Sequence, residues 1–125
     1  MVYTGNSNYK VKFYRDSKKG NSPALEYIEK LNQKERTKIL KYIEFLRLNN
    51  GYLDEPYSKH IKGKIRELRV DFGHNRHRIF YFAFVEKIII LLNGFLKKTE
   101  KTPLAEIIKA EAYLAVVLQN KKMYE

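Results

Sequence analysis

Five consecutive aliphatic residues, Ile88 to Leu92, constrain the fold of this 125-residue chain more than any other segment. The run is far too short to span a bilayer, which needs about 20 apolar residues. It suits a strand that is covered on both faces, because a strand with one wet face alternates apolar and polar residues. We therefore predict a central buried strand over residues 87–95.

Further strands are predicted on either side of this one in the sequence. Residues 65–70 and 76–84 are the first two, separated by a turn at Asp71-Phe-Gly73, and a turn at Val85-Glu86 leads into the third. Connections this short favour antiparallel pairing. Alternation over Tyr9–Tyr14 predicts a separate half-buried strand near the start of the chain, whereas residues 52–63, which contain Pro56, are predicted to form a loop.

Apolar residues at helical spacing predict three helices. Ser22-Pro23 has the pattern of an N-cap and first-turn proline, and a first helix follows it. After a break at Asn32-Gln33 a second helix runs to about Leu48, where Asn49-Asn50-Gly51 ends it. The same cap-then-proline pattern at Thr102-Pro103 opens a closing helix over 104–118.

The predicted fold class is α+β, in one domain over residues 1–125. Its sheet is mainly antiparallel, with an N-terminal helical hairpin and a C-terminal helix, and a hydrophobic fraction of 44% is enough for a core. Residues 1–8 and 119–125 are expected to fray. The absence of cysteine excludes disulfides and thiolate metal sites and is compatible with a cytoplasmic location, as is an N-terminus without a signal-peptide pattern.

The positive charge of the chain is concentrated in its middle. The formal net charge is +11, and residues 59–101 hold 11 Lys and Arg against 4 Asp and Glu, whereas residues 102–125 hold 3 of each. This concentration favours a polyanionic partner, most simply nucleic acid, although an acidic protein or anionic lipid would also fit. Membrane binding is disfavoured because the basic segment is predicted to form strands and not a basic amphipathic helix.

Common catalytic signatures are missing from the sequence, which contains no glycine-rich phosphate loop, nucleophile elbow or paired metal ligands. His74 and His77 are three residues apart, but a solvent-facing pair explains them better than a zinc site, which needs more ligands. We expect neither a metal nor a cofactor.

Several residues of the basic segment are candidates for a site. Arg69 and Glu67 share one strand face, which a simple ion pair on a wet face would also explain, and Arg78 begins an aromatic strand that would hold its guanidinium for phosphate. Tyr81 could face a site or pack in the core. Lys97 and Lys98 follow the buried strand, and alternation lets only one of them face a given site. His60 and His77 could exchange a proton near neutral pH.

The order of these segments resembles the RelE/ParE toxin superfamily, and within it the phage-derived HigB-type branch. The resemblance rests on Glu67-Leu-Arg69, Arg78-Ile-Phe-Tyr81, and the string from Leu92 through Phe95-Leu-Lys97-Lys98 to Pro103, and it covers about residues 60–112. The Phe-x-Lys-Lys-Thr-x-Lys-Thr-Pro portion is the most specific part. A RelE-like fold is implied.

What this resemblance implies is a toxin of a type II toxin–antitoxin system that cleaves mRNA on the ribosome without a metal. Arg69, Arg78, Lys97 and Lys98 become the candidate catalytic residues, with Tyr81 beside them. Neighbouring basic residues are expected to bind RNA, namely Lys64, Arg66, Arg76, His77 and Lys101. The implied partners are the ribosome, mRNA and a helix-turn-helix, HigA-like antitoxin, with a heterotetramer as one arrangement of the complex.

Two alternatives stay open at the level of sequence. Some members of the superfamily inhibit gyrase, and a non-catalytic RNA-binding module would use exposed aromatic residues for stacking. The sequence also departs from the superfamily pattern in one respect. Several members carry a catalytic tyrosine shortly after the final strand, where this chain has Thr102-Pro103-Leu104 and reaches a tyrosine only at Tyr113. The general acid is therefore not assigned.

Overall fold

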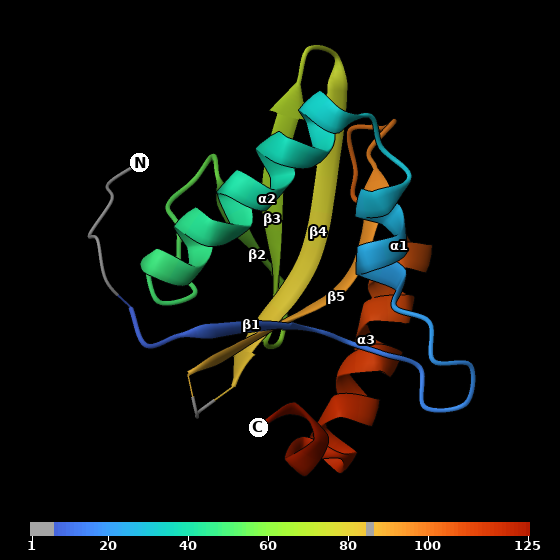
Figure 1. Ribbon diagram of the computed structural model, residues 1–125. Coiled ribbons are helices and arrows are strands. Elements are labelled where there is room, and N and C mark those ends of the chain that lie inside the picture. Colours follow the sequence, from blue (N-terminus) through green and yellow to red (C-terminus); the bar gives the residue numbers. More distant parts are fainter. Residues whose placement is uncertain (1–6, 85–86) are drawn as a thin grey trace.

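The sheet of this protein has five strands in the order β1-β5-β4-β3-β2 (Figure 1). The computed structural model describes residues 7–84 and 87–125. The strands are β1 (Lys10–Phe13), β2 (Ser58–Lys62), β3 (Ile65–Phe72), β4 (Asn75–Phe84) and β5 (Ile88–Leu96). Strands β2 to β5 pair antiparallel, and β1 pairs parallel to β5, so the sheet is mixed but mainly antiparallel.

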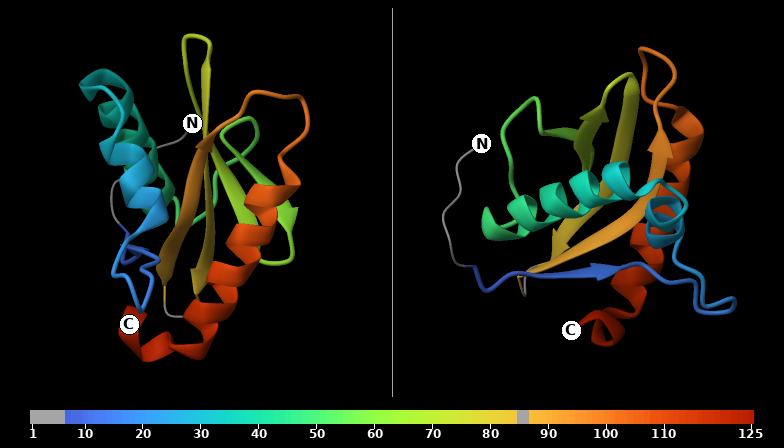
Figure 2. Two further views of the ribbon diagram at one scale, coloured as in Figure 1. Left: turned by 90° about the vertical axis from the view of Figure 1, so that its right-hand side faces the viewer. Right: turned by 45° about the horizontal axis from the view of Figure 1, so that its top comes forward.

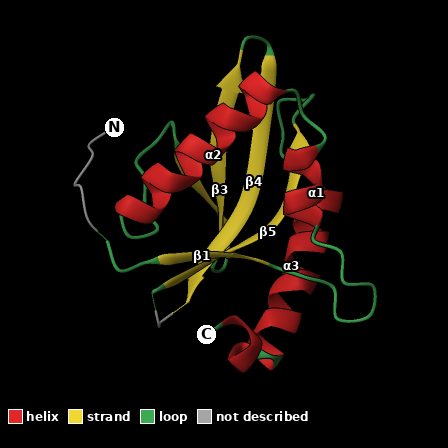
Figure 3. Ribbon diagram, in the orientation of Figure 1, coloured by secondary structure: helices red, strands yellow, loops and turns green. Residues whose placement is uncertain are grey.

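Helices cover both faces of the sheet. They are α1 (Pro23–Glu29), α2 (Gln33–Leu48) and α3 (Leu104–Gln119), followed by a short 3-10 helix, η1 (Lys121–Tyr124). The left view of Figure 2 shows α1 and α2 on one face and α3 on the other, and Figure 3 shows the same three layers by secondary structure. The predicted α+β architecture, with a helical hairpin before the sheet and a closing helix after it, is confirmed.

Each face of the sheet has its own apolar core. Ile28 and Ile39 of the helical hairpin pack with Leu68, Ile79 and other residues on one face. On the opposite face Phe80, Phe82 and Ile90 pack with α3 residues such as Val117. Strand β5 contributes to both cores, and residues 88–93 are all buried. The prediction of a central strand covered on both faces is confirmed.

A β-bulge in β5 changes which residues face α3. Phe80 lies opposite Asn93 and Tyr81 lies opposite Leu91, so Leu92 is an extra residue between the two pairs. Leu92 belongs to the α3-side core, and the next residue, Asn93, also reaches α3 through a 3.2 Å hydrogen bond from its side-chain nitrogen to the Glu106 carbonyl oxygen. The bulge therefore resets the alternation of β5 after Leu92.

Several boundaries differ from the sequence prediction. The loop predicted over residues 52–63 is wrong in part, since Ser58–Lys62 forms the edge strand β2. This strand is held by backbone pairing to β3 and is mostly exposed, so it lacks the apolar alternation by which strands are found. The turn predicted at 71–73 is also displaced: β3 continues to Phe72, and Gly73 takes a positive φ of 59° between the two strands.

The helix starts were predicted more accurately than their caps. Ser22 is the N-cap of α1, with Pro23 in its first turn, but the Ser22 hydroxyl donates to the Tyr14 carbonyl oxygen at 2.8 Å. At α3 the N-cap is Pro103 and not Thr102, and the Pro103 carbonyl oxygen accepts from the Glu106 amide at 3.1 Å.

The two ends of the chain also differ from expectation where they are described. Tyr124 in η1 is buried, and its hydroxyl accepts a 3.1 Å hydrogen bond from the Arg15 amide, so the tail expected to fray packs against the fold. Near the other end, Ser7 hydrogen-bonds Asn50 at 2.9 Å. Residues 1–6, and the turn predicted at Val85-Glu86, lie outside the described residues.

Candidate functional site

A fully buried carboxylate lies between two arginines on the α3 side of the sheet. Glu67 and Arg69 are two residues apart on β3, so their side chains lie on the same face of the sheet. Arg69 is directly opposite Arg78 on β4, so the Arg78 side chain shares that face. Arg69 Nε lies 3.2 Å and Arg78 Nε 3.8 Å from Glu67 Oε1. Glu67 has no solvent-exposed surface. The solvent-exposed ion pair that the sequence also allowed is therefore not what the structure shows at this position.

The guanidinium of Arg78 is held from its outer side as well. Its Nη1 donates to Asp71 Oδ1 at 2.7 Å and to the His77 carbonyl oxygen at 3.0 Å. The Arg78 side chain is only 5% exposed, whereas the Asp71 side chain is 61% exposed. Asp71 thus lies on the rim of the site, where an incoming anion would compete with it for Arg78.

Lys97 joins the same group from the segment after β5. Its amide donates to the Arg76 carbonyl oxygen at 2.8 Å, and the residue is 8% exposed, whereas Lys98 is exposed. Burial lowers the pKa of the Lys97 ammonium below its usual value, and the charges of Arg69 and neighbouring arginines lower it further, against an opposing effect of Glu67. As alternation requires, the two lysines differ, and Lys97 is the one beside Glu67.

We call this group the cationic cluster: Arg69, Arg76, Arg78 and Lys97 around Glu67 and Asp71. Four cations and two carboxylates leave a formal charge of +2. Neither carboxylate oxygen of Glu67 has a hydrogen-bond partner among the described residues, and the same is true of the Nε atoms of Arg69 and Arg78. Charges so incompletely satisfied are typical of sites that bind a ligand.

The cluster reaches solvent mainly at Arg69 and Asp71, whose side chains are 23% and 61% exposed. It lies towards the end of β3 and β4 that carries the turn at Gly73, and the left view of Figure 2 shows that α3 runs along the other part of this face. The loop after β5 carries two more exposed cations, Lys98 and Lys101, on the way to α3. This arrangement can bind an anion such as a phosphate at a surface formed by strands and one loop.

Four residues predicted for the site lie elsewhere. Tyr81 faces the α1–α2 layer, where it is fully buried and its hydroxyl lies 2.7 Å from Ser58 Oγ; burial raises the pKa of the Tyr81 hydroxyl. Arg66 is on that side too, with its guanidinium 4.8 Å from the centre of the Tyr52 ring. Lys64 is exposed at the turn between β2 and β3. The fourth, His77, belongs to a separate polar chain.

That polar chain crosses the layer between the helical hairpin and the sheet. The Tyr27 hydroxyl lies 2.6 Å from His77 Nδ1, His77 Nε2 lies 3.0 Å from Glu35 Oε2, and Asn75 donates to Glu35 Oε1 at 2.7 Å. Burial, with the Glu35 charge, raises the pKa of Tyr27 to about 12, so this hydroxyl keeps its proton at neutral pH and can donate to His77 Nδ1. In that tautomer His77 donates from Nε2 to Glu35.

Gly94 leaves the space that the Tyr27 ring occupies in this polar chain. A Cβ atom on Gly94 would lie 2.8 Å from Tyr27 Cδ2 and 2.8 Å from Ile79 Cδ1, so these side chains would have to move. The close approach of the Tyr27 ring to β5 brings its hydroxyl to His77, whose carbonyl oxygen accepts from Arg78 on the opposite face of the sheet. Sequence reasoning missed this polar chain because its hydrogen bonds join residues 40 to 50 positions apart.

The remaining sequence candidates have simple surroundings. Tyr113, the first tyrosine after the final strand, is stacked on Tyr14 with ring centres 4.4 Å apart and is used in packing. His60 Nε2 lies 2.8 Å from the Gly63 carbonyl oxygen at the exposed edge of the sheet. Over residues 7–84 and 87–125 no group of three His, Asp or Glu side chains is placed to hold a metal.

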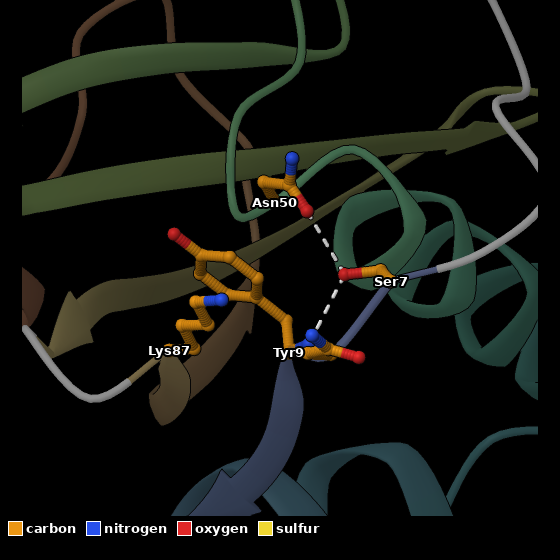
Figure 4. Close-up of a pocket in the computed structure, with 5 residues that line it drawn as sticks. Ser7, Tyr9, Asn50 and Lys87 are labelled. Atoms are coloured by element: carbon orange, nitrogen blue, oxygen red, sulfur yellow. Dashed lines mark hydrogen bonds between the residues drawn. The ribbon is translucent and has the colours of Figure 1, made fainter.

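Hollows elsewhere on the surface do not contain the cluster. One is lined by Ser7, Asn8, Tyr9, Asn50 and Lys87, and Figure 4 shows Ser7 bridging Tyr9 and Asn50 through hydrogen bonds. These contacts join β1 to the end of α2 and bring no cationic group of the cluster near. In the described part of the chain, no helix has the length and apolar character required to cross a membrane.

Comparison with known proteins identifies the family to which this chain belongs. A search of curated proteins finds no match. A model of the family described as "Phage derived protein Gp49-like (DUF891)" matches residues 26–115, which is more than two thirds of the chain and contains the whole cationic cluster. The chain therefore belongs to the Gp49-like family of phage-derived proteins, a family associated with toxins of the RelE/ParE type.

Proposed function

We propose that this protein is a HigB-type toxin of a type II toxin–antitoxin system and that it cleaves mRNA on the ribosome. The observation that carries the proposal is the convergence of Arg69, Arg78 and Lys97 around one buried carboxylate, with Asp71 exposed at the rim. Membership of a toxin-associated family supports the toxin part. The excess of positive charge, +11 over the chain, suits an RNA target.

The proposed reaction uses the RNA as its own nucleophile. The ribose 2′-oxygen forms a bond to the adjacent phosphorus, and the bond from phosphorus to the 5′-oxygen breaks, leaving a 2′,3′-cyclic phosphate. Negative charge grows on the phosphoryl oxygens as this happens. Fixed cationic donors stabilise such charge most effectively where water is excluded, as it is around Arg78 and Lys97.

The two arginines have different parts in this scheme. Arg69 has a side-chain exposure of 23% and is the more accessible, so it makes the first contact with the phosphate. Arg78 is held by Asp71 until the phosphate replaces that carboxylate, after which its planar fork binds the phosphoryl oxygens. Glu67 keeps both guanidiniums oriented in the absence of RNA.

Lys97 is the candidate for proton transfer. A lysine can accept the 2′-hydroxyl proton only in its neutral form, and the lowered pKa of Lys97 makes that form more abundant than for a free lysine. The 5′-oxygen takes its proton from water in this scheme, because the tyrosine that follows the final strand in other members of the superfamily has no counterpart at 102–104.

Partners follow from the same proposal. The ribosome presents the mRNA, and a helix-turn-helix antitoxin of the HigA type neutralises the toxin. Lys98 and Lys101 are exposed on the loop beside the cluster and contact the RNA backbone in this arrangement.

Induced expression of the toxin, followed by mapping of mRNA 5′ ends, tests the proposal. Cuts at a fixed position relative to the reading frame are expected for the natural protein. Arg69→Gln and Arg78→Lys should both abolish these cuts. Lysine at position 78 keeps the positive charge but lacks the planar pair of guanidinium donors that binds two phosphate oxygens.

The matched control is Arg15→Gln, which removes an exposed arginine that is hydrogen-bonded to Gly20 and not to the cluster. It should leave the cuts unchanged, and circular dichroism should show that all three variants are folded. Intact mRNA in cells that stop growing with DNA damage would overturn the nuclease and point to gyrase instead.

A further inference from the structure

The outer face of α3 is open to solvent and mainly apolar, with Lys109 as the charged residue among those exposed on the helix. Leu104 is 68% exposed and Ile108 is 56% exposed, and Ala105, Ala112 and Ala115 are also exposed along the helix. A helix that covers one face of a sheet normally carries charged residues on its outer side. Only three of the sixteen residues of α3 are charged, so this face is unusual for a surface that meets water alone.

The exposed residues continue into a groove. Leu104, Ile108, Glu111, Ala115 and Leu118 follow one another at intervals of four and three, so they form one stripe along α3. Glu111, Ala115 and Leu118, with Leu114, line a groove of about 320 Å³ between the helix and the turn that joins β2 to β3. The other wall consists of Lys62, Gly63, Lys64 and Ile65. We call the stripe and the groove together the α3 surface.

Charges surround the α3 surface on the groove side. Lys62 and Lys64 line the groove and are exposed. Lys101 lies at the other end of the stripe, three residues before Leu104. Lys62 forms an ion pair with Glu111 at 3.2 Å, but its side chain is 63% exposed and the pair is therefore weak. A stripe that is apolar except for Glu111, with lysines beside its groove, matches an apolar segment that has carboxylates along its edge.

The dimensions and chemistry favour a helix of a partner protein. The stripe from Leu104 to Leu118 extends about 21 Å at 1.5 Å per residue, which is the length of a helix of about four turns. RNA is a poor occupant because aliphatic side chains offer neither donors for phosphate nor rings for stacking. A second copy of this chain is disfavoured because each copy carries a net charge of +11.

We propose that the α3 surface binds an amphipathic helix of a partner protein, with an apolar face against Leu104, Ile108 and the groove and with carboxylates facing Lys62 and Lys64. The mode is that of a helix in a groove, with apolar anchors at i, i+3, i+4 and i+7. The α3 surface has no residue in common with the cationic cluster, so it goes beyond the proposed nuclease and its test does not depend on RNA cleavage.

A synthetic helical peptide provides the probe. It carries leucines at i, i+3, i+4 and i+7 on one face and glutamates along both flanks of that face, and its binding to the full-length protein is followed by fluorescence anisotropy. Two control peptides have the same length: one has a shuffled order of the same residues, and one has lysine in place of each glutamate. The first peptide is expected to bind more tightly than either control by about tenfold or more.

Substitutions in the protein show where the peptide binds. The double variant Leu104→Ser, Ile108→Ser is expected to weaken binding by about tenfold, and Lys62→Gln with Lys64→Gln by a similar factor that shrinks at high salt. Leu40→Ser is the matched control, because Leu40 is 47% exposed on α2, on the opposite face of the sheet. It should bind the peptide as the natural protein does.

Three outcomes would overturn the inference. The shuffled peptide could bind as well as the amphipathic one, which would mean that charge alone attracts it. The Leu104→Ser, Ile108→Ser variant could bind normally. Sedimentation could also show a dimer of the natural protein that this variant dissolves, in which case a second copy is the occupant. Loss of RNA cleavage in the cluster variants leaves all these results unchanged, so the two proposals fail separately.

Discussion

The carboxylate of Glu67 lies 3.2 Å from the Nε of Arg69, and no part of Glu67 reaches solvent. Removing a carboxylate and a guanidinium from water costs several kcal/mol, and their mutual attraction offsets this desolvation only when the geometry is good. The Glu67 oxygens have no hydrogen-bond partner among the described residues, so the attraction offsets the desolvation only in part. A pair of this kind is better explained by the need to hold arginines in place than by stability.

Replacing Glu67 should destabilise the protein because the arginines beside it would keep their charges without a counter-ion. For Glu67→Gln we expect the free energy of unfolding to fall by about 3 kcal/mol, as measured by urea denaturation. Glu111→Gln is the control, since it removes the same charge from an ion pair whose two side chains are 63% and 41% exposed. It should change stability by less than about 1 kcal/mol. Equal effects would contradict the interpretation of the Glu67 pair.

Lys97 should lose its proton at a lower pH than a free lysine, whose pKa is about 10.4. Burial is the main cause, and Glu67 opposes it, so Glu67→Gln should lower the pKa of Lys97 further. The measurement is a pH titration of the lysine Cε resonances by NMR, with the Lys97 signal assigned by its loss in Lys97→Arg. A titration midpoint of Lys97 at or above that of free lysine would refute the prediction.

The same shift has a consequence for stability, with a defined sign. Between the lowered pKa of Lys97 in the folded state and the usual value in the unfolded state, the unfolded chain binds more protons at this residue. The contribution of Lys97 to the free energy of unfolding therefore rises with pH across that window. Lys97→Arg stays charged throughout, so comparison of the two proteins at several alkaline pH values isolates the effect.

Asp71 should weaken RNA binding, because it occupies the donor of Arg78 that a phosphate would use. We expect Asp71→Asn to raise the affinity for a short labelled single-stranded RNA by up to about fivefold, since a partly exposed ion pair contributes at most about 1 kcal/mol. Fluorescence anisotropy at a fixed salt concentration measures this. Asp54→Asn makes the same change in net charge at another exposed aspartate, so a similar gain there would attribute the effect to charge alone.

Much of the fold follows from local patterns in the sequence. The run Ile88–Leu92 predicts a central strand, and the apolar spacing of 104–118 predicts the closing helix, because both elements bury faces that their own residues define. The edge strand Ser58–Lys62 could not be predicted in this way. Apart from Ile61 its side chains are polar, most of them are exposed, and its pairing with β3 uses backbone groups that every sequence possesses.

The candidate site was predictable only in part, for a similar reason. Alternation places Glu67, Arg69 and Asp71 on one face of β3, so Asp71 could have been included from the sequence. The bulge at Leu92 could not be predicted, although it shifts the alternation of β5 by one residue and so affects which of Lys97 and Lys98 faces the cluster. The burial of Tyr81 on the other face depends on the hairpin of helices, which packs there from far away in the chain.

Gly94 should be intolerant of a side chain because the Tyr27 ring occupies the space. A Cβ atom there would lie 2.8 Å from both the Tyr27 ring and Ile79, so Gly94→Ala is expected to lower the free energy of unfolding by about 1–3 kcal/mol. The displaced ring would also draw the Tyr27 hydroxyl away from His77. Urea denaturation gives the stability, and the NMR signals of the His77 ring report the hydrogen bond.

The control for Gly94 is Gly73→Ala. Gly73 has a positive φ of 59° and open space around its Cα, so the substitution strains only the backbone, at a cost of about 1–2 kcal/mol. It should leave the His77 signals unchanged, whereas Gly94→Ala should shift them. Tyr27→Phe removes the hydroxyl but keeps the ring, so it should shift the same signals without the steric effect. Unchanged His77 signals in Gly94→Ala would show that the Tyr27 ring does not need the space above β5.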